Sequence, residues 1–78
     1  MTSDEREFFN DVKDAVSDYD YSFEHYYDDD GQFCVDVVVD MDDWDSDETW
    51  EALSDVADDW GAGIDSDMNT YSLGVYFN

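Results

Sequence analysis

The chain has 78 residues and a formal net charge of −22, from 24 acidic and 2 basic side chains. This length allows one domain, residues 1–78, with a small core. A hydrophobic content of 42% and an aromatic content of 18% exclude a disordered acidic tail, which is poor in aromatics. The charge disfavours nucleic acid and anionic membranes as direct partners and favours basic proteins or cations.

Composition also points to a cellular compartment. The single cysteine, Cys34, cannot form an internal disulfide, so we expect a reducing, cytoplasmic environment. No apolar run approaches the length of a membrane span, and the first residues lack the pattern of a signal peptide. Most carboxylates belong to Asp, which holds its charge close to the backbone and suits a fixed charge pattern as well as caps and turns.

Residues 2–18 are predicted to form the first helix. Thr2 and Glu5 have the spacing of a capping box. One face carries an apolar stripe, made of Phe8, Phe9, Val12, Val16 and Tyr19. A second face is acidic, with Glu7, Asp11, Asp14 and Asp18. A third face holds both cationic residues, Arg6 and Lys13.

Residues 21–27 and 32–41 are predicted to form a β-hairpin. Apolar residues of the second segment fall at every second position, as in a half-buried strand, at Phe33, Val35, Val37, Val39 and Met41. A three-residue loop, 29–31, with Gly31 at positive φ would pair residue 27 with 33, 25 with 35, 23 with 37 and 21 with 39. A two-residue turn would shift the register by one and misplace a whole face.

Residues 47–60 are predicted to form the second helix. Trp50 and Trp60 belong to its apolar stripe and are expected in the core, whereas Trp44 fits either core or surface. Its acidic stripe consists of Glu48, Glu51, Asp55, Asp58 and Asp59. Asp45 or Ser46 would cap its start, and Gly61 stands where a helix-terminating glycine belongs.

The order of elements predicts an α+β fold. Residues 62–69 form either a loop or a short extra strand, and residues 71–77 alternate as a last strand. We expect α-β-β-α-β, a small antiparallel three-stranded sheet with both helices on one face. The last strand is expected to pair with residues 21–27.

Catalytic and metal motifs are weak in this sequence. Asp28, Asp29, Asp30 and Gly31 are similar to part of a calcium loop, but the required ligands at positions one and twelve are Tyr26 and Val37. A hairpin turn is therefore favoured, and the acidic residues 40–47 are expected to be a solvated loop rather than a cation site. His25 has no catalytic partners, and we expect it half-buried under a helix. We predict no enzyme activity, cofactor or metal.

Two surfaces are candidates for partner binding. The sheet face away from the helices carries Tyr26, Val38 and Tyr76 among carboxylates, which suits a protein interface or a homodimer contact. The acidic stripes are the second candidate. Duplex DNA carries one charge per ~1.7 Å, so 22 charges span roughly 37 Å, close to the ~30 Å diameter of such a domain.

In size, charge, acidic stripes and lack of catalytic motifs, the chain resembles small phage-encoded inhibitors that mimic DNA. The resemblance implies a non-enzymatic inhibitor that fills the basic DNA-binding site of a host defence complex in the host cytoplasm, with anti-CRISPR activity first and anti-restriction activity next. The expected partner-binding residues are Glu7, Asp11, Asp14, Asp18, Asp28, Asp29, Asp30, Asp36, Asp40, Glu48, Glu51, Asp55, Asp58 and Asp59.

Two alternatives account for the same charge. Proteins of extreme halophiles are acidic and poor in lysine, so the charge would then be an adaptation to brine that says nothing of function. Only four alanines and many aromatics speak against this interpretation. The third interpretation, a cation buffer, rests on the acidic cluster of residues 40–47 alone.

Overall fold

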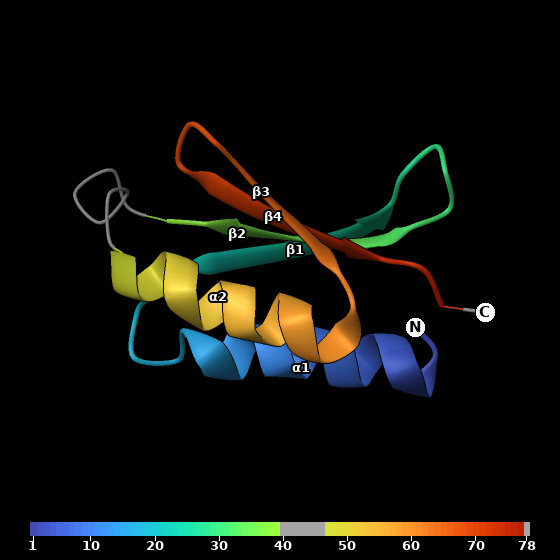
Figure 1. The fold of residues 1–78 in the computed structure, drawn as a ribbon, viewed down its shortest axis with the longest axis horizontal. Coiled ribbons are helices and arrows are strands. Elements are labelled where there is room, and N and C mark those ends of the chain that lie inside the picture. The colour runs from blue at the N-terminus through green and yellow to red at the C-terminus, as the bar shows by residue number, and fades with distance from the viewer. Residues whose placement is uncertain (40–46, 78) are drawn as a thin grey trace.

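The computed structural model describes residues 1–39 and 47–77, which form two layers. The elements are α1 (Ser3–Ala15), β1 (Ser22–Tyr27), β2 (Phe33–Val38), α2 (Asp47–Trp60), β3 (Gly63–Asp67) and β4 (Thr70–Val75). Both helices lie on one face of the sheet and run in opposite directions (Figure 1). This arrangement confirms the α+β class and the placement of both helices on one side.

The sheet has four antiparallel strands in the order β1-β2-β4-β3. The expectation of three strands is therefore wrong, because residues 63–67 form β3, the short extra strand that the sequence left open beside a loop. The expected pairing of the last strand with residues 21–27 is also wrong, because β4 pairs with β2 and β3. Alternate residues of β4 are buried at Tyr71, Leu73 and Val75, and a central position gives this apolar strand neighbours on both edges.

The register of the first hairpin is confirmed. Phe23 pairs with Val37, His25 with Val35, and residue 27 with residue 33, while the expected pairing of residues 21 and 39 lies beyond the strand ends. Gly31 has φ of 87°, a value that glycine adopts without steric cost. Asp28 closes the turn, because its backbone N–H donates to the Gln32 carbonyl at 3.1 Å.

Both helices begin or end where local chemistry requires. Thr2 and Glu5 form the expected capping box, but α1 ends at Ala15 and residues 16–18 form a turn, so the predicted helix is too long. The bounds of α2 match the prediction. Gly61, at φ of 65°, ends α2, and the Ala62 N–H donates to the Ala57 carbonyl at 2.8 Å as in a Schellman motif. The expected caps of α2, residues 45 and 46, lie outside the described residues.

The core fills the space between the helices and the sheet. Its fully buried members include Phe8, Val12, Val35, Leu53 and Leu73, drawn from four elements. Apolar faces of helical and strand periodicity meet there, which excludes water from one side of the sheet only.

Three aromatic side chains and Met41 test the predicted core further. Trp60 is partly buried and packs edge-on against Phe8, as expected. Trp50 is 40% exposed, so its placement in the core is wrong; its ring lies 6.0 Å from that of Tyr71 at the rim. His25 is exposed rather than half-buried, because β1 is an edge strand, although its ring meets Phe9 of α1. Residues 41 and 44 lie outside the described residues.

Candidate functional site: the acidic helix face

The two helices bring both predicted acidic stripes to one side of the molecule. Trp60, at the end of α2, donates its indole N–H to Asp11 Oδ2 at 2.8 Å. Tyr19, after α1, donates its hydroxyl to Glu48 Oε2 at 3.2 Å. We call the following exposed carboxylates the helix face: Glu7, Asp11, Asp14, Asp18, Glu48, Glu51, Asp55, Asp58 and Asp59.

Helical periodicity explains why these carboxylates point away from the sheet. In α1 the buried residues Phe8 and Val12 face the sheet, whereas Asp11 lies about 100° around the helix from Val12 and contacts Trp60 of α2. In α2 the buried residues Leu53 and Val56 set the same orientation. The outward positions of both helices are acidic, so the helix layer presents a nearly continuous negative surface.

The described basic side chains do not interrupt this surface. The ammonium group of Lys13 lies 5.4 Å from the centroid of the Phe9 ring. Phe9 contacts His25, so this cation lies on the side of α1 next to β1, away from α2. Trp60 and Tyr19 are neutral donors, so their hydrogen bonds to Asp11 and Glu48 add no positive charge to the helix face. The chemistry of the helix face is therefore electrostatic attraction of cationic groups.

The hairpin tip carries three further predicted carboxylates, and they differ in role. Asp28 is half-buried, and its Oδ1 accepts hydrogen bonds from the N–H groups of Asp30 and Gln32, at 2.9 Å each. Its side chain therefore holds the turn. Asp29 and Asp30 are exposed and free to face a partner only at the far end of the sheet.

A hydrogen-bonded link that sequence reasoning missed ties this end of the sheet to α1. Tyr27 donates its hydroxyl to Glu5 Oε2 at 2.5 Å, and Glu5 Oε1 accepts from the Thr2 N–H at 2.8 Å. The Tyr27 bond is the main cause that lowers the pKa of Glu5, and the same bond raises the pKa of Tyr27. The partners are 22 positions apart in the sequence, and no sequence pattern predicted this contact.

Asp36 belongs to the opposite face of the molecule. It is half-buried in the central strand β2 and accepts hydrogen bonds from Ser72, at 2.7 Å, and from Tyr26, at 3.3 Å. The sheet separates it from the helix face. Asp36 therefore lies on the sheet face away from the helices, as the alternation of residues 33–41 predicts, and its part in partner binding stays a prediction. Asp40 lies outside the described residues.

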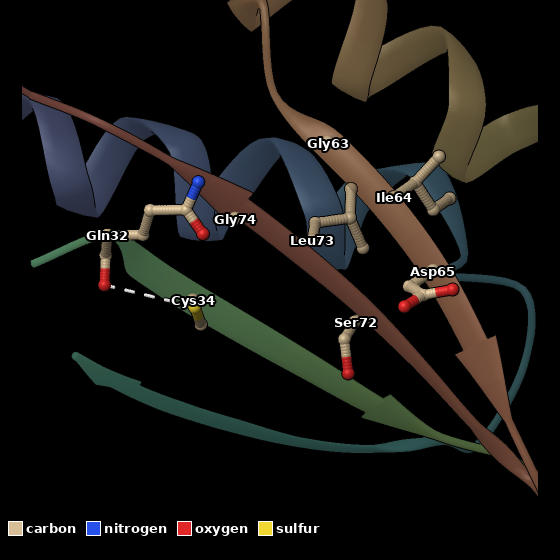
Figure 2. Close-up of a pocket in the computed structure, with 8 residues that line it drawn as sticks. All are labelled: Gln32, Cys34, Gly63, Ile64, Asp65, Ser72, Leu73 and Gly74. Atoms are coloured by element: carbon tan, nitrogen blue, oxygen red, sulfur yellow. Dashed lines mark hydrogen bonds between the residues drawn. The ribbon is translucent and has the colours of Figure 1, made fainter. Parts of the chain in front are cut away.

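The sheet face that turns away from the helices, here the open sheet face, contains a hollow of about 320 Å³ (Figure 2). Cys34, Gly63, Asp65, Ser72 and Gly74 line it. Burial raises the pKa of the Cys34 thiol, and the charges of nearby aspartates act in the same direction, so the thiol stays protonated at neutral pH.

Two tyrosines interact electrostatically with Cys34, which lines this hollow. Tyr26 and Tyr76 are 43% and 53% exposed. Desolvation raises the pKa of both hydroxyls, aided by Asp36 for Tyr26 and by Asp30 for Tyr76, so both remain neutral donors at physiological pH. Val38 is half-buried on the same face. The homodimer expectation for this face stays a prediction.

Within residues 1–39 and 47–77, no group of three or more His, Cys, Asp or Glu side chains is placed to hold a metal ion. Neither described helix has the length and apolar content needed to cross a bilayer. No family model, curated protein or solved structure matches the chain.

Proposed function

We propose that the protein is a non-enzymatic inhibitor that imitates the charge of nucleic acid and occupies the basic DNA-binding site of a host defence complex. The observation that carries the proposal is the helix face: eight exposed carboxylates lie in α1 and α2, and a ninth, Asp18, lies just after α1. Both helices cover the same face of the sheet (Figure 1). A single basic channel on a partner can therefore contact several of these carboxylates at once.

The density of charge along the molecule supports the same proposal. The longest dimension is 36 Å and the other two are 22 and 19 Å. Dividing 36 Å by 22 net charges gives one negative charge per about 1.6 Å. Duplex DNA carries one per about 1.7 Å of helix axis. A basic groove that binds duplex DNA would therefore meet a similar linear charge density on this protein.

The binding mechanism follows from counterions and from short side chains. Ions held near a basic channel and near the acidic helices are released when the two surfaces meet, which favours association at low salt. Asp side chains have few rotamers to immobilise, so less conformational entropy is lost than with longer acidic side chains. Aspartates form most of the helix face and hold their charges in fixed positions.

The assignment to defence complexes follows from the resemblance to phage-encoded DNA mimics. RNA-guided surveillance complexes are the first target class and restriction enzymes the next. Both bind DNA through extended basic surfaces, and an inhibitor of either acts in the host cytoplasm.

Charge reversal on the helix face tests the proposal. Asp14→Lys with Asp55→Lys places one cation on each helix, at exposed positions, and changes the net charge from −22 to −18. The matched control, Glu24→Lys with Asp67→Lys, makes the same change at exposed positions of β1 and β3, away from the helix face. The measurement is displacement of fluorescent duplex DNA from a panel of purified surveillance complexes and restriction enzymes.

We expect the wild-type protein and the control to displace DNA from at least one member of the panel. The helix-face variant should be weaker on the order of tenfold at low salt, since about 1.4 kcal/mol of binding free energy is lost. Equal weakening of both variants would show that bulk charge, rather than the helix face, is responsible. A wild-type protein that displaces DNA from no member contradicts the proposal.

One observation favours a second function class, salt adaptation. Carboxylates also occupy the hairpin tip and the open sheet face, where a single DNA-shaped contact does not reach. Carboxylates on every face are expected of a salt-adapted protein, because they keep its surface hydrated in brine. The dependence of folding on salt concentration separates DNA mimicry from salt adaptation.

A further inference from the structure

The open sheet face has a regular arrangement that the DNA-mimic proposal does not use. The antiparallel register aligns outward-facing residues in rows across the four strands. One row is Tyr26, Cys34, Gly74 and Gly63. The next row is Glu24, Asp36, Ser72 and Asp65. We infer that these two rows form a docking site for an arginine side chain presented by a basic protein partner.

The glycine row provides the space for such a side chain. Gly63 and Gly74 are paired across β3 and β4, so two neighbouring positions on the outer surface lack side chains. This absence leaves the hollow of about 320 Å³, seen between the labelled residues in Figure 2. A Cβ at Gly74 would lie 2.9 Å from Gln32 Oε1, so a larger residue here would displace the end of the Gln32 side chain, which lines the hollow.

The acidic row provides the charge. Neighbouring strands lie ~4.8 Å apart, so Asp36 and Asp65, which are two strands apart, flank Ser72 at roughly one strand spacing each. Asp36 accepts hydrogen bonds from Ser72 and Tyr26, and an ionised carboxylate has lone pairs for further donors. A cationic group above Ser72 is therefore within reach of two carboxylates.

The tyrosines favour arginine over lysine. Tyr26 stands in the glycine row, across Cys34, and Tyr76 is two residues beyond Gly74 on the same side of β4. Both rings are largely exposed. A guanidinium group pairs with carboxylates through a planar fork and also stacks on aromatic rings, whereas an ammonium group does so less well.

Charge complementarity favours a basic partner over a second copy of the chain as the occupant. Each copy would bring Glu24, Asp36 and Asp65 to the contact, and like charges at an interface oppose binding. The only two cationic side chains, Arg6 and Lys13, belong to α1 in the other layer. The site therefore fits a basic partner, and it does not depend on whether the helix face imitates DNA.

An NMR titration of the ¹⁵N-labelled protein with a capped Gly-Arg-Gly-Arg-Gly peptide tests this inference. We expect saturable shifts that centre on the amides of Cys34, Asp65, Ser72 and Gly74, with few on α1 and α2. The lysine counterpart of the peptide should bind about two- to fivefold more weakly, and the uncharged citrulline counterpart should not saturate.

Two variants locate the site without disturbing the core. Gly63→Val fills the hollow, and a Cβ at this position meets no atom within 4 Å. Asp65→Asn removes one carboxylate of the acidic row. Each should weaken arginine-peptide binding by about two- to fivefold, whereas the charge-matched control Asp20→Asn should leave it unchanged.

Three results would overturn the inference. The first is a set of shifts spread evenly over the helix face and the sheet, which would mean attraction to bulk charge. The second is wild-type affinity in both Gly63→Val and Asp65→Asn. The third is a concentration-dependent dimer, by sedimentation, whose contact maps to the open sheet face.

Discussion

At the residue scale, the bond between Tyr27 and Glu5 joins the hairpin to the start of α1. Glu5 is 5% exposed, yet it also completes the capping box with Thr2. A buried carboxylate of this kind is retained because hydrogen bonds compensate its desolvation. The lowered pKa of Glu5 shows that the folded state favours its charged form. Its contribution to stability is therefore present above the ordinary pKa of about 4.5 and is lost as the pH falls through the lowered value.

Tyr27→Phe tests this link. At pH 7 the variant should have a smaller free energy of unfolding than the wild type, because Glu5 loses its strongest hydrogen bond. The difference should shrink as the pH falls below 4, since protonated Glu5 no longer benefits from the donor. Urea unfolding at pH 7 and pH 3, followed by circular dichroism, measures the difference.

The comparison between variants is the informative quantity, because acid also removes repulsion among the other carboxylates. Tyr76→Phe is the control, since Tyr76 is exposed and its pKa is raised by desolvation first and then by the charges of Asp30 and Asp28, without Glu5. The same pH dependence in both variants would rule out a specific role for Tyr27.

At the scale of elements, the sequence predicts those parts of the fold whose signals are local. The period of α1 and α2, the capping box and the glycine at residue 61 are each decided within a few residues, and the structure confirms them. The register of the first hairpin is likewise fixed by Gly31 and by the alternation in β2. Local chemistry therefore predicts elements and hairpins well.

The parts that were missed depend on contacts between distant residues. β3 has one large apolar residue, Ile64, and two aspartates, which is the composition of a loop; it becomes a strand because β4 offers it a free edge. The turn before β4 has Met68 at φ of 55°, and methionine is not one of the residue types from which a tight turn is predicted. The same limit applies to the candidate site, where helical spacing predicted the two acidic stripes but not the hydrogen bonds from Trp60 to Asp11 and from Tyr19 to Glu48.

Hydrogen exchange of backbone amides tests the strand order. We expect slow exchange along β2 and β4, which are paired on both edges, and faster exchange at the outward N–H groups of β1 and β3. NMR at pH 6 gives the rate for each residue. Slow exchange in β1 with a fast outward edge in β4 would support the pairing that the sequence suggested.

The burial of β4 predicts an energetic difference between its residues and those of β3. Leu73 is fully buried, so Leu73→Ala should lower the free energy of unfolding by about 2–5 kcal/mol. Ile64, its partner in the pair, is only half-buried, and Ile64→Ala should cost less. Urea unfolding at pH 7 compares them, and an equal cost would contradict a central β4 beside an edge β3.

At the scale of the whole molecule, the net charge of −22 acts on stability as well as on binding. With a radius of gyration of 11.6 Å, most carboxylates lie within reach of one another at low ionic strength. Their repulsion opposes the compact state and is screened as the Debye length falls from ~10 Å at 0.1 M salt to ~3 Å at 1 M.

Far-UV circular dichroism from near-zero salt to molar KCl separates mimicry from salt adaptation. We expect a folded protein at 0.15 M KCl whose thermal midpoint rises with salt. The pair of neutralising changes Asp20→Asn and Asp67→Asn should make this rise shallower. A protein that folds only in molar salt would instead favour an adaptation to brine.

Mutually exclusive binding is the property that distinguishes a DNA mimic from other inhibitors. A target complex identified in the displacement assay is first saturated with duplex DNA, and the labelled protein is then added under conditions in which the DNA does not dissociate. Mass photometry counts the species. We expect binary complexes only, with the protein excluded by bound DNA and admitted when the DNA is removed. A ternary complex of target, DNA and protein would contradict occupation of the DNA-binding site.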